Sequence, residues 1–114
     1  MIHASFRMKF GQTKLTEARD VLIGLLDRTK ASPGCLGCNI YQEVLDLNAL
    51  LFEEWWETET DLYKRLCSDS FWHLLLVMDM AAKPPEISFE FISETTGIET
   101  IEKARSLTPN GETP

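Results

Sequence analysis

The first residues of the chain alternate between apolar and polar side chains. The even positions from Ile2 to Met8 are apolar, and the residues between them are polar: His3, Ser5 and Arg7. A period of two residues is typical of a strand with one buried face, so residues 2–8 are predicted to form a strand. From about residue 13 to residue 31 the apolar residues follow helical spacing instead: Ala18, Leu22, Leu25 and Leu26. This segment is predicted to be an amphipathic helix that ends at the sequence SPG.

Two further alternating stretches are predicted to form a hairpin. In residues 36–44 one face carries Leu36, Cys38, Ile40 and Val44, and the other carries Asn39, Tyr41 and Glu43. Residues 46–48 have the composition of a turn, and residues 50–57 read LLFEEWWE, a strand rich in aromatic side chains.

The pattern becomes helical from Thr58, which can cap a helix with Leu62 and Leu66 on one face. Ser68 or Asp69 can cap a second helix, whose sequence FWHLLLVMDMAA is apolar on almost every side. We therefore expect this second helix to be covered on more than one side.

The C-terminal part begins with another alternating stretch, EISFEFIS, which predicts a fourth strand over residues 86–93. A capping box from Thr96 to Glu99 predicts the start of a short last helix. We expect one domain over residues 1–105 and a disordered tail over residues 106–114.

The order strand, helix, strand, strand, helix, strand predicts an α+β fold of the ferredoxin-like type. Such a fold is a split βαβ arrangement, with an antiparallel sheet and its helices on one face. The other face stays uncovered, and we expect Cys35, Ile92 and tryptophans of the third strand to lie there among polar residues. A homodimer formed face to face is the simplest cover, and contact with water is the alternative.

Composition limits the partners of the protein. Its 114 residues suffice for one domain with its own core, and 18 acidic against 11 basic side chains give a net charge of -7. No lysine or arginine cluster runs along any segment, which argues against nucleic acid and against an anionic membrane as partners. The longest apolar run outside the strands, LLLVM, is too short to cross a bilayer. We expect a soluble, cytoplasmic protein.

Three cysteines, an odd number, fit a reducing compartment better than a disulfide framework. Cys35 and Cys38 lie three positions apart in a predicted strand and should point to opposite faces, and Cys67 has no companion. We interpret all three as small hydrophobic residues rather than as a redox pair or a metal site.

The motifs SPGCLGCNIYQEV, FEEWWETETDLYKRLCSDSF and EISF resemble the antibiotic biosynthesis monooxygenase (ABM) superfamily of dimeric α/β barrels. The matching residues are Pro33, Gly34, Cys35, Glu54, Trp56, Thr58, Leu62, Ser68 and Phe71. The resemblance covers about residues 1–95 and implies the dimeric fold. It implies a reaction less firmly, because the superfamily includes cofactor-independent monooxygenases, quinol oxidases, haem degraders, isomerases and members with no known activity.

One position departs from the family pattern. Arg65 stands where the family has a histidine. We expect Arg65, on the helix, to form an ion pair with Glu54, on the third strand, because arginine can hold a carboxylate with two parallel hydrogen bonds. Arginine does not lose its proton in proteins, so Arg65 cannot act as a base. Glu53 points the other way and is expected to lie at the rim or in solvent.

The haem-degrading members suggest a test for a cofactor. The position of their histidine ligand is Leu75 here, and His73 is displaced by two residues, or about 200° around a helix. The sequence therefore predicts no haem, and we expect neither a metal nor another cofactor.

An oxygenase without a cofactor needs an apolar cavity and a group that takes a proton from a phenol or hydroquinone. The candidates for lining the cavity and binding a small aromatic molecule are Trp55, Trp56, Phe71, Trp72 and Asn39. The candidates for catalytic contacts are His73, Tyr41 and Arg65, and His3 is a further titratable residue. The same aromatic residues could instead be ordinary core.

Two function classes remain open. One is an ABM-type monooxygenase that oxidises a quinol or a polycyclic aromatic molecule. The other is a dimeric ligand-binding or sensor protein that keeps the fold and the cavity but has lost the chemistry.

Overall fold

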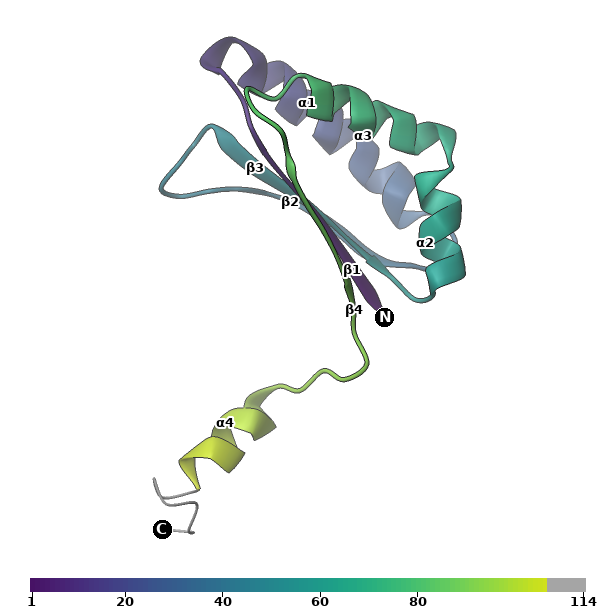
Figure 1. Cartoon of the computed structure of the whole chain (residues 1–114), viewed down its shortest axis with the longest axis vertical. Coiled ribbons are helices and arrows are strands. Elements are labelled where there is room, and N and C mark those ends of the chain that lie inside the picture. The colour runs from purple at the N-terminus through teal and green to yellow at the C-terminus, as the bar shows by residue number, and fades with distance from the viewer. Residues whose placement is uncertain (107–114) are drawn as a thin grey trace.

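The computed structural model describes residues 1–106. The elements follow the order β1 (Ile2–Lys9), α1 (Gln12–Lys30), β2 (Cys35–Gln42), β3 (Ala49–Trp56), α2 (Glu59–Leu66), α3 (Asp69–Asp79), β4 (Glu86–Phe91), α4 (Ile98–Arg105). The strands form one antiparallel sheet with the order β2-β3-β1-β4. Helices α1 to α3 lie on one side of this sheet (Figure 1). The predicted ferredoxin-like α+β fold is confirmed.

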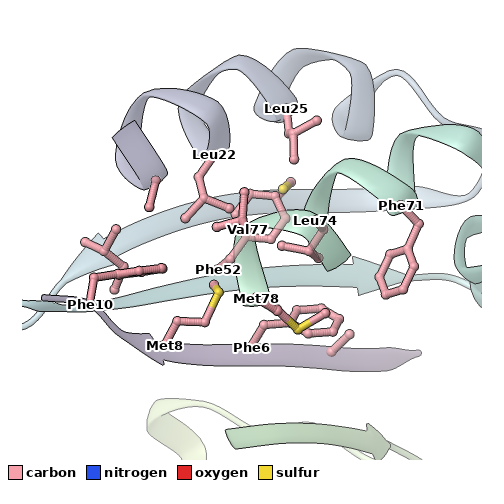
Figure 2. Packing of buried hydrophobic residues seen from close by; sticks show 14 residues of the cluster. Phe6, Met8, Phe10, Leu22, Leu25, Phe52, Phe71, Leu74, Val77 and Met78 are labelled. Atoms are coloured by element: carbon pink, nitrogen blue, oxygen red, sulfur yellow. The ribbon is translucent and has the colours of Figure 1, made fainter. Parts of the chain in front are cut away.

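The register of β1 and β3 determines which side chains meet the helices. Ile2 pairs with Trp56, Ala4 with Glu54 and Phe6 with Phe52, and these side chains share the covered face. Alternation along β1 buries its even positions and leaves its odd positions on the open face. The core lies between this face and helices α1 and α3, as Figure 2 shows for Phe52, Leu22 and Leu74.

Two of the predicted helix caps are present. The Thr58 hydroxyl accepts a hydrogen bond from the Asp61 N–H at 3.2 Å, and the Ser68 hydroxyl accepts one from the Phe71 N–H at 3.3 Å. The capping box predicted from Thr96 to Glu99 is wrong, because Thr96 is not the N-cap of α4. Gly97 is the N-cap, and the Glu99 carboxylate accepts a hydrogen bond from the Gly97 N–H at 2.7 Å.

A β-bulge in β2 corrects the predicted faces of that strand. The register shifts between Cys35 and Gly37, so Cys35 lies opposite Trp56 and Cys38 lies opposite Glu54. Both cysteines therefore lie on the covered face, although a regular strand would point them apart. Val44 lies beyond the end of the strand and is exposed. Leu36 lies within the strand, and its side chain is exposed too.

Among residues 1–106, helix α3 is covered on one side only. Its core face carries Phe71, Leu74, Val77 and Met78, which are buried against the sheet and α1. Trp72, Leu75 and Leu76 are exposed on the outer side. The expectation that this helix is covered on more than one side is not met by the described part of the chain.

The C-terminal helix α4 stands away from the sheet and from helices α1 to α3 (Figure 1). The radius of gyration is 17.8 Å, against roughly 13 Å for a compact domain of this size. The domain boundary at residue 105 stays a prediction, and the tail predicted to be disordered lies, from residue 107 onward, outside the described residues. Within residues 1–106, no helix is both long enough and apolar enough to span a bilayer.

Candidate functional site

The predicted ion pair between Glu54 on β3 and Arg65 on α2 is present. The Arg65 Nη2 donates to Glu54 Oε2 at 2.9 Å and Nε donates to Oε1 at 3.1 Å, and each side chain is only 1% exposed. The Trp56 indole N–H donates to Glu54 Oε1 at 3.0 Å, and the Arg65 Nη1 donates to the Ser70 hydroxyl at 2.7 Å. Partners within the chain satisfy this buried group, so it ties α2 and the start of α3 to the sheet.

A small cavity of about 170 Å³ adjoins this pair. Its lining residues are Ser32, Pro33, Trp56, Asp61, Lys64, Arg65 and Ser68. Gly34 closes the turn beside it with φ +80°, and a Cβ at this position would lie 2.1 Å from the Asp61 carboxylate. Only glycine allows the turn to come this close to α2. The cavity is smaller than the usual range for ligand pockets, roughly 300–1,000 Å³, and its volume suits at most a single ring.

The open face of the sheet carries a polar network centred on Glu53. Its carboxylate contacts the His3 Nε2 at 2.9 Å, the Tyr41 hydroxyl at 3.1 Å and the Asn39 amide nitrogen at 3.4 Å. The Trp55 ring stacks against the His3 ring with 4.1 Å between centroids. No helix within residues 1–106 covers this face, yet the side chains of His3 and Glu53 are only 17% and 15% exposed.

The network shifts the pKa values of two of its members. Burial raises the pKa of Glu53, but hydrogen bonds from His3, Tyr41, Trp55 and Asn39 outweigh this effect, and the net pKa is lowered. The pKa of Tyr41 is raised, first because its hydroxyl donates to the Glu53 carboxylate and then because of partial burial and the negative charge. Glu53 is therefore an ionised acceptor, and Tyr41 is a protonated donor at neutral pH.

Ion pairs flank this network on the same face. The Arg7 guanidinium on β1 forms a two-point pair with Glu43 and lies 3.5 Å from Glu86. Its hydrogen bond to Glu43 raises the pKa of Arg7 and lowers that of Glu43. The Lys9 ammonium lies 2.8 Å from Asp46. Strand β1 thus carries cationic side chains on this face, and carboxylates from neighbouring segments pair with them.

The predicted site residues fall into three separate groups. Trp56, Arg65 and Phe71 lie on the covered side of the sheet, where the Arg65 guanidinium lies 5.3 Å above the Phe71 ring. The open face holds Tyr41, Asn39 and Trp55. Trp72 and His73 are exposed on α3. The expectation of one cavity lined by all of them is therefore wrong, because Trp55 and Trp56 are neighbours in a strand and point to opposite faces.

Sequence reasoning assigned Glu53 to the rim or to solvent, and the structure makes it the centre of the network instead. The signal was present, because alternation assigns Glu53, His3, Asn39 and Tyr41 to the polar faces of their strands. Only the register shows that they meet. Asn39 lies directly opposite Glu53, and His3 lies opposite Trp55, which is two residues from Glu53 and on the same face.

The expected composition of the open face also needs correction. Cys35 lies on the covered face, and Trp55 is the only tryptophan of β3 on the open face. In residues 1–106, no group of three or more His, Cys, Asp or Glu side chains is arranged to hold a metal ion. Cys38 is buried, which raises the pKa of its thiol to about 12 and leaves it protonated.

The fold and these two groups define the class of protein: a ferredoxin-like α+β domain with a buried ion pair behind the sheet and a polar network in front. Solved structures share this fold. A protein of Deinococcus radiodurans, named provisionally as an antibiotic biosynthesis monooxygenase, is 14% identical with a TM-score of 0.78, covering 86% of this chain and 98% of that chain.

Two further solved structures are similar. Rv0793 from Mycobacterium tuberculosis is 14% identical with a TM-score of 0.76, covering 84% of this chain and 98% of its own. A conserved protein from Methanosarcina mazei Go1 is 24% identical with a TM-score of 0.73, covering 78% and 89% respectively. At these identities the likeness shows the fold alone.

The sequence itself identifies the family. The model of the family described as antibiotic biosynthesis monooxygenase matches residues 1–73, which is more than half of the chain. The chain therefore belongs to the antibiotic biosynthesis monooxygenase (ABM) family. No curated protein matches it significantly.

Proposed function

We propose that this protein is a cofactor-independent monooxygenase that oxidises a hydroxylated aromatic small molecule, such as a quinol or a polycyclic phenol. The observation that carries the proposal is the pairing of His3 with Glu53 beside Trp55 on the open face. A titratable imidazole oriented by a carboxylate is the arrangement of a general base. Family membership supports the same reaction type.

The proposed roles follow from the contacts. When the His3 Nε2 donates to Glu53, its Nδ1 carries the lone pair that can accept the phenol proton. Trp55 offers a flat apolar surface for the ring. The Tyr41 hydroxyl already donates its one hydrogen to Glu53, so its oxygen can accept a hydrogen bond from a substrate hydroxyl, whereas Asn39 has a second amide hydrogen for a substrate oxygen. The resulting electron-rich anion reacts with O₂. One oxygen atom becomes a carbonyl at a ring CH position, and the other leaves as water with the hydrogen of that position and the phenol proton that His3 returns, so that the phenol becomes a quinone.

Among the three residues that the sequence nominated for catalysis, only Tyr41 belongs to this network. Arg65 is held in its buried pair, and His73 is exposed on the outer helix surface. His73 remains a candidate that the experiment below can restore. His3 takes the place of His73 in the proposal because it has both an orienting carboxylate and an aromatic surface beside it.

The proposal includes a homodimer, in which a second copy covers the open face of the sheet. A two-fold axis would bring one copy of the network toward the other and shield both from bulk water, which strengthens electrostatic contacts to an anionic substrate. The face is mostly polar and bordered by ion pairs, so this interface would be specified by charge and hydrogen bonds rather than by apolar area.

A non-catalytic ligand-binding protein of the same fold is the second candidate. The observation that favours it is the 170 Å³ cavity beside Arg65. The residue that replaces the family histidine there is a permanent cation whose charge is already paired with Glu54, so Arg65 does not supply this cavity with a base.

Oxygen consumption separates the two candidates. Purified protein with no added metal, flavin or nicotinamide should consume O₂ with a hydroquinone or a hydroxylated polycyclic aromatic, above an autoxidation control. His3→Gln and Glu53→Gln should each lower kcat/KM by roughly 10²-fold or more. Glu90→Gln is the matched control, because Glu90 lies opposite His3 on the other neighbouring strand and is exposed.

Three results would contradict this assignment. If His73→Gln abolishes activity and His3→Gln does not, the chemistry belongs to α3. If the same aromatics raise the melting temperature but no O₂ is consumed above the control, the protein binds them without oxidising them. A monomer in light scattering at micromolar concentration would remove the proposed dimer.

A further inference from the structure

The edge strand β4 has an apolar face that the helices do not cover. Ile87, Phe89 and Phe91 pair with Phe6, Ala4 and Ile2, which places them on the helix side of the sheet. All six residues of β4 are nevertheless exposed, including Ile87 at 50% and Phe91 at 55%. The helix layer therefore ends before this edge. A row of exposed apolar side chains on an edge strand indicates that another segment packs there.

Helix α4 has apolar residues, but they pack against no surface among the described residues. It is eight residues long, and its apolar residues Ile98 and Ile101 lie on one side of it, 68% and 58% exposed. None of its residues is buried. An isolated helix of this length is not stable in water, because its few hydrogen bonds do not offset the cost of nucleation. A surface outside its own residues must therefore stabilise α4.

The path of the chain indicates which copy supplies that surface. Residue 92 is still anchored to the sheet, because the Ile92 N–H donates to the Met1 carbonyl at 2.8 Å. From there the chain runs past the end of β4, and α4 lies on the side of the sheet away from α1 and α3 (Figure 1). That is the side on which a second copy would cover the open face. Residues 92–97 can span about 20 Å, roughly twice the spacing of two packed sheets.

We propose that α4 is an exchanged arm, which packs Ile98 and Ile101 onto the exposed face of β4 in a second copy of the chain. This inference rests on the proposed homodimer. Each chain has one helix α4 and one exposed apolar face of β4. In a two-fold symmetric dimer, each α4 would pack on the β4 face of the other chain, so neither surface would stay uncovered. The arm would also cover the open hollow of about 340 Å³ beside Phe91 and Ile92.

A cysteine pair divided between two chains tests the exchange. One chain carries Ile87→Cys and the other carries Ile101→Cys, both with Cys67→Ser to remove the exposed native thiol. The two chains are co-expressed with different tags and then oxidised mildly. Random pairing makes about half of the dimers mixed, and we expect these mixed dimers to become covalent dimers that carry both tags. Each single-cysteine chain alone is the blank.

The matched control replaces Ile101→Cys with Lys103→Cys, which lies on the other side of α4 and should cross-link several-fold less. In a chain that carries Ile87→Cys and Ile101→Cys together, a disulfide within one chain would show that α4 folds back onto its own strand and would overturn the exchange. So would the absence of any disulfide.

Light scattering on the unoxidised variants separates this failure from failure of the dimer. A dimer without cross-links refutes only the arm exchange, and a monomer refutes the dimer and the exchange together.

Discussion

Glu53 and Glu54 are adjacent in the sequence and lie in opposite surroundings. Glu54 points into the helix layer, where one arginine and one indole satisfy it. Glu53 points to the open face, where it gathers neutral and titratable donors from β1 and β2. The difference shows how a strand assigns neighbouring residues of one type to different tasks. The buried carboxylate ties a helix to the sheet, and the carboxylate on the open face joins side chains of three strands.

The energetic consequences of removing a partner should differ accordingly. A buried charge without its partner retains the full cost of desolvation, whereas a charge on the open face can recover hydration when a donor is lost. Three substitutions test this ranking.

The largest effect is expected for Arg65→Ala. It leaves Glu54 buried without its cation, and it should lower the free energy of unfolding by about 3–5 kcal/mol. Urea denaturation measures the change, with Lys64→Ala, an exposed neighbour on the same helix, as the control. A loss within about 0.5 kcal/mol would show that water reaches Glu54. The double variant Glu54→Leu, Arg65→Met should lose less than half as much, because it leaves no charge unpaired.

A smaller and pH-dependent effect is expected for Glu53→Gln. At pH 7 it should cost about 1 kcal/mol, because Gln keeps one acceptor oxygen and the loss is close to that of one ordinary hydrogen bond. The pKa of Glu53 is lowered in the folded state. The contribution of Glu53 to the free energy of unfolding is therefore fully present above about pH 4.5, and it is lost as the pH falls through the pKa of the folded state. The difference between wild type and variant should therefore shrink below pH 4.5. A constant difference from pH 7 to pH 3 would contradict this linkage.

The smallest effect is expected for Lys9→Ala, also on the open face. Lys9 and Asp46 form a well-aligned pair, but about a third of each side chain is exposed. Solvent screens such a pair, so the melting temperature should change by less than about 3 °C, and less still at high salt. Calorimetry measures it. A change as large as that of Arg65→Ala would mean that the two faces do not differ in the way described.

The sequence predicted the elements well because their periods were clear. The alternation of β1, the helical spacing of α1 and the caps at Thr58 and Ser68 all reappear in the structure. The ion pair between Glu54 and Arg65 could also be inferred, since a carboxylate on a buried strand face needs a partner and the next helix supplied one.

The candidate site was harder to predict because it depends on register. A pattern of alternation shows which face a residue occupies but not which residue of the next strand lies beside it. The bulge after Cys35 is likewise invisible in the alternation, and it moved two cysteines to the same face. The outer side of α3 and the strand β4 are exposed because no further helix packs there among the described residues. The local pattern of apolar and polar residues does not show how far the helix layer extends.

The strand order β2-β3-β1-β4 has a consequence for the order of events in folding. The first strand of the chain is central, and its two neighbours come from residues 49–56 and 86–91. Pairing across such sequence separations is slow, because a long loop must close before the contacts form. During synthesis the sheet stays incomplete until β4 has left the ribosome. Until then, the edge of β1 that pairs with β4 has no hydrogen-bonding partner. Any chain that stops before residue 86 would keep that edge open to pairing with other strands.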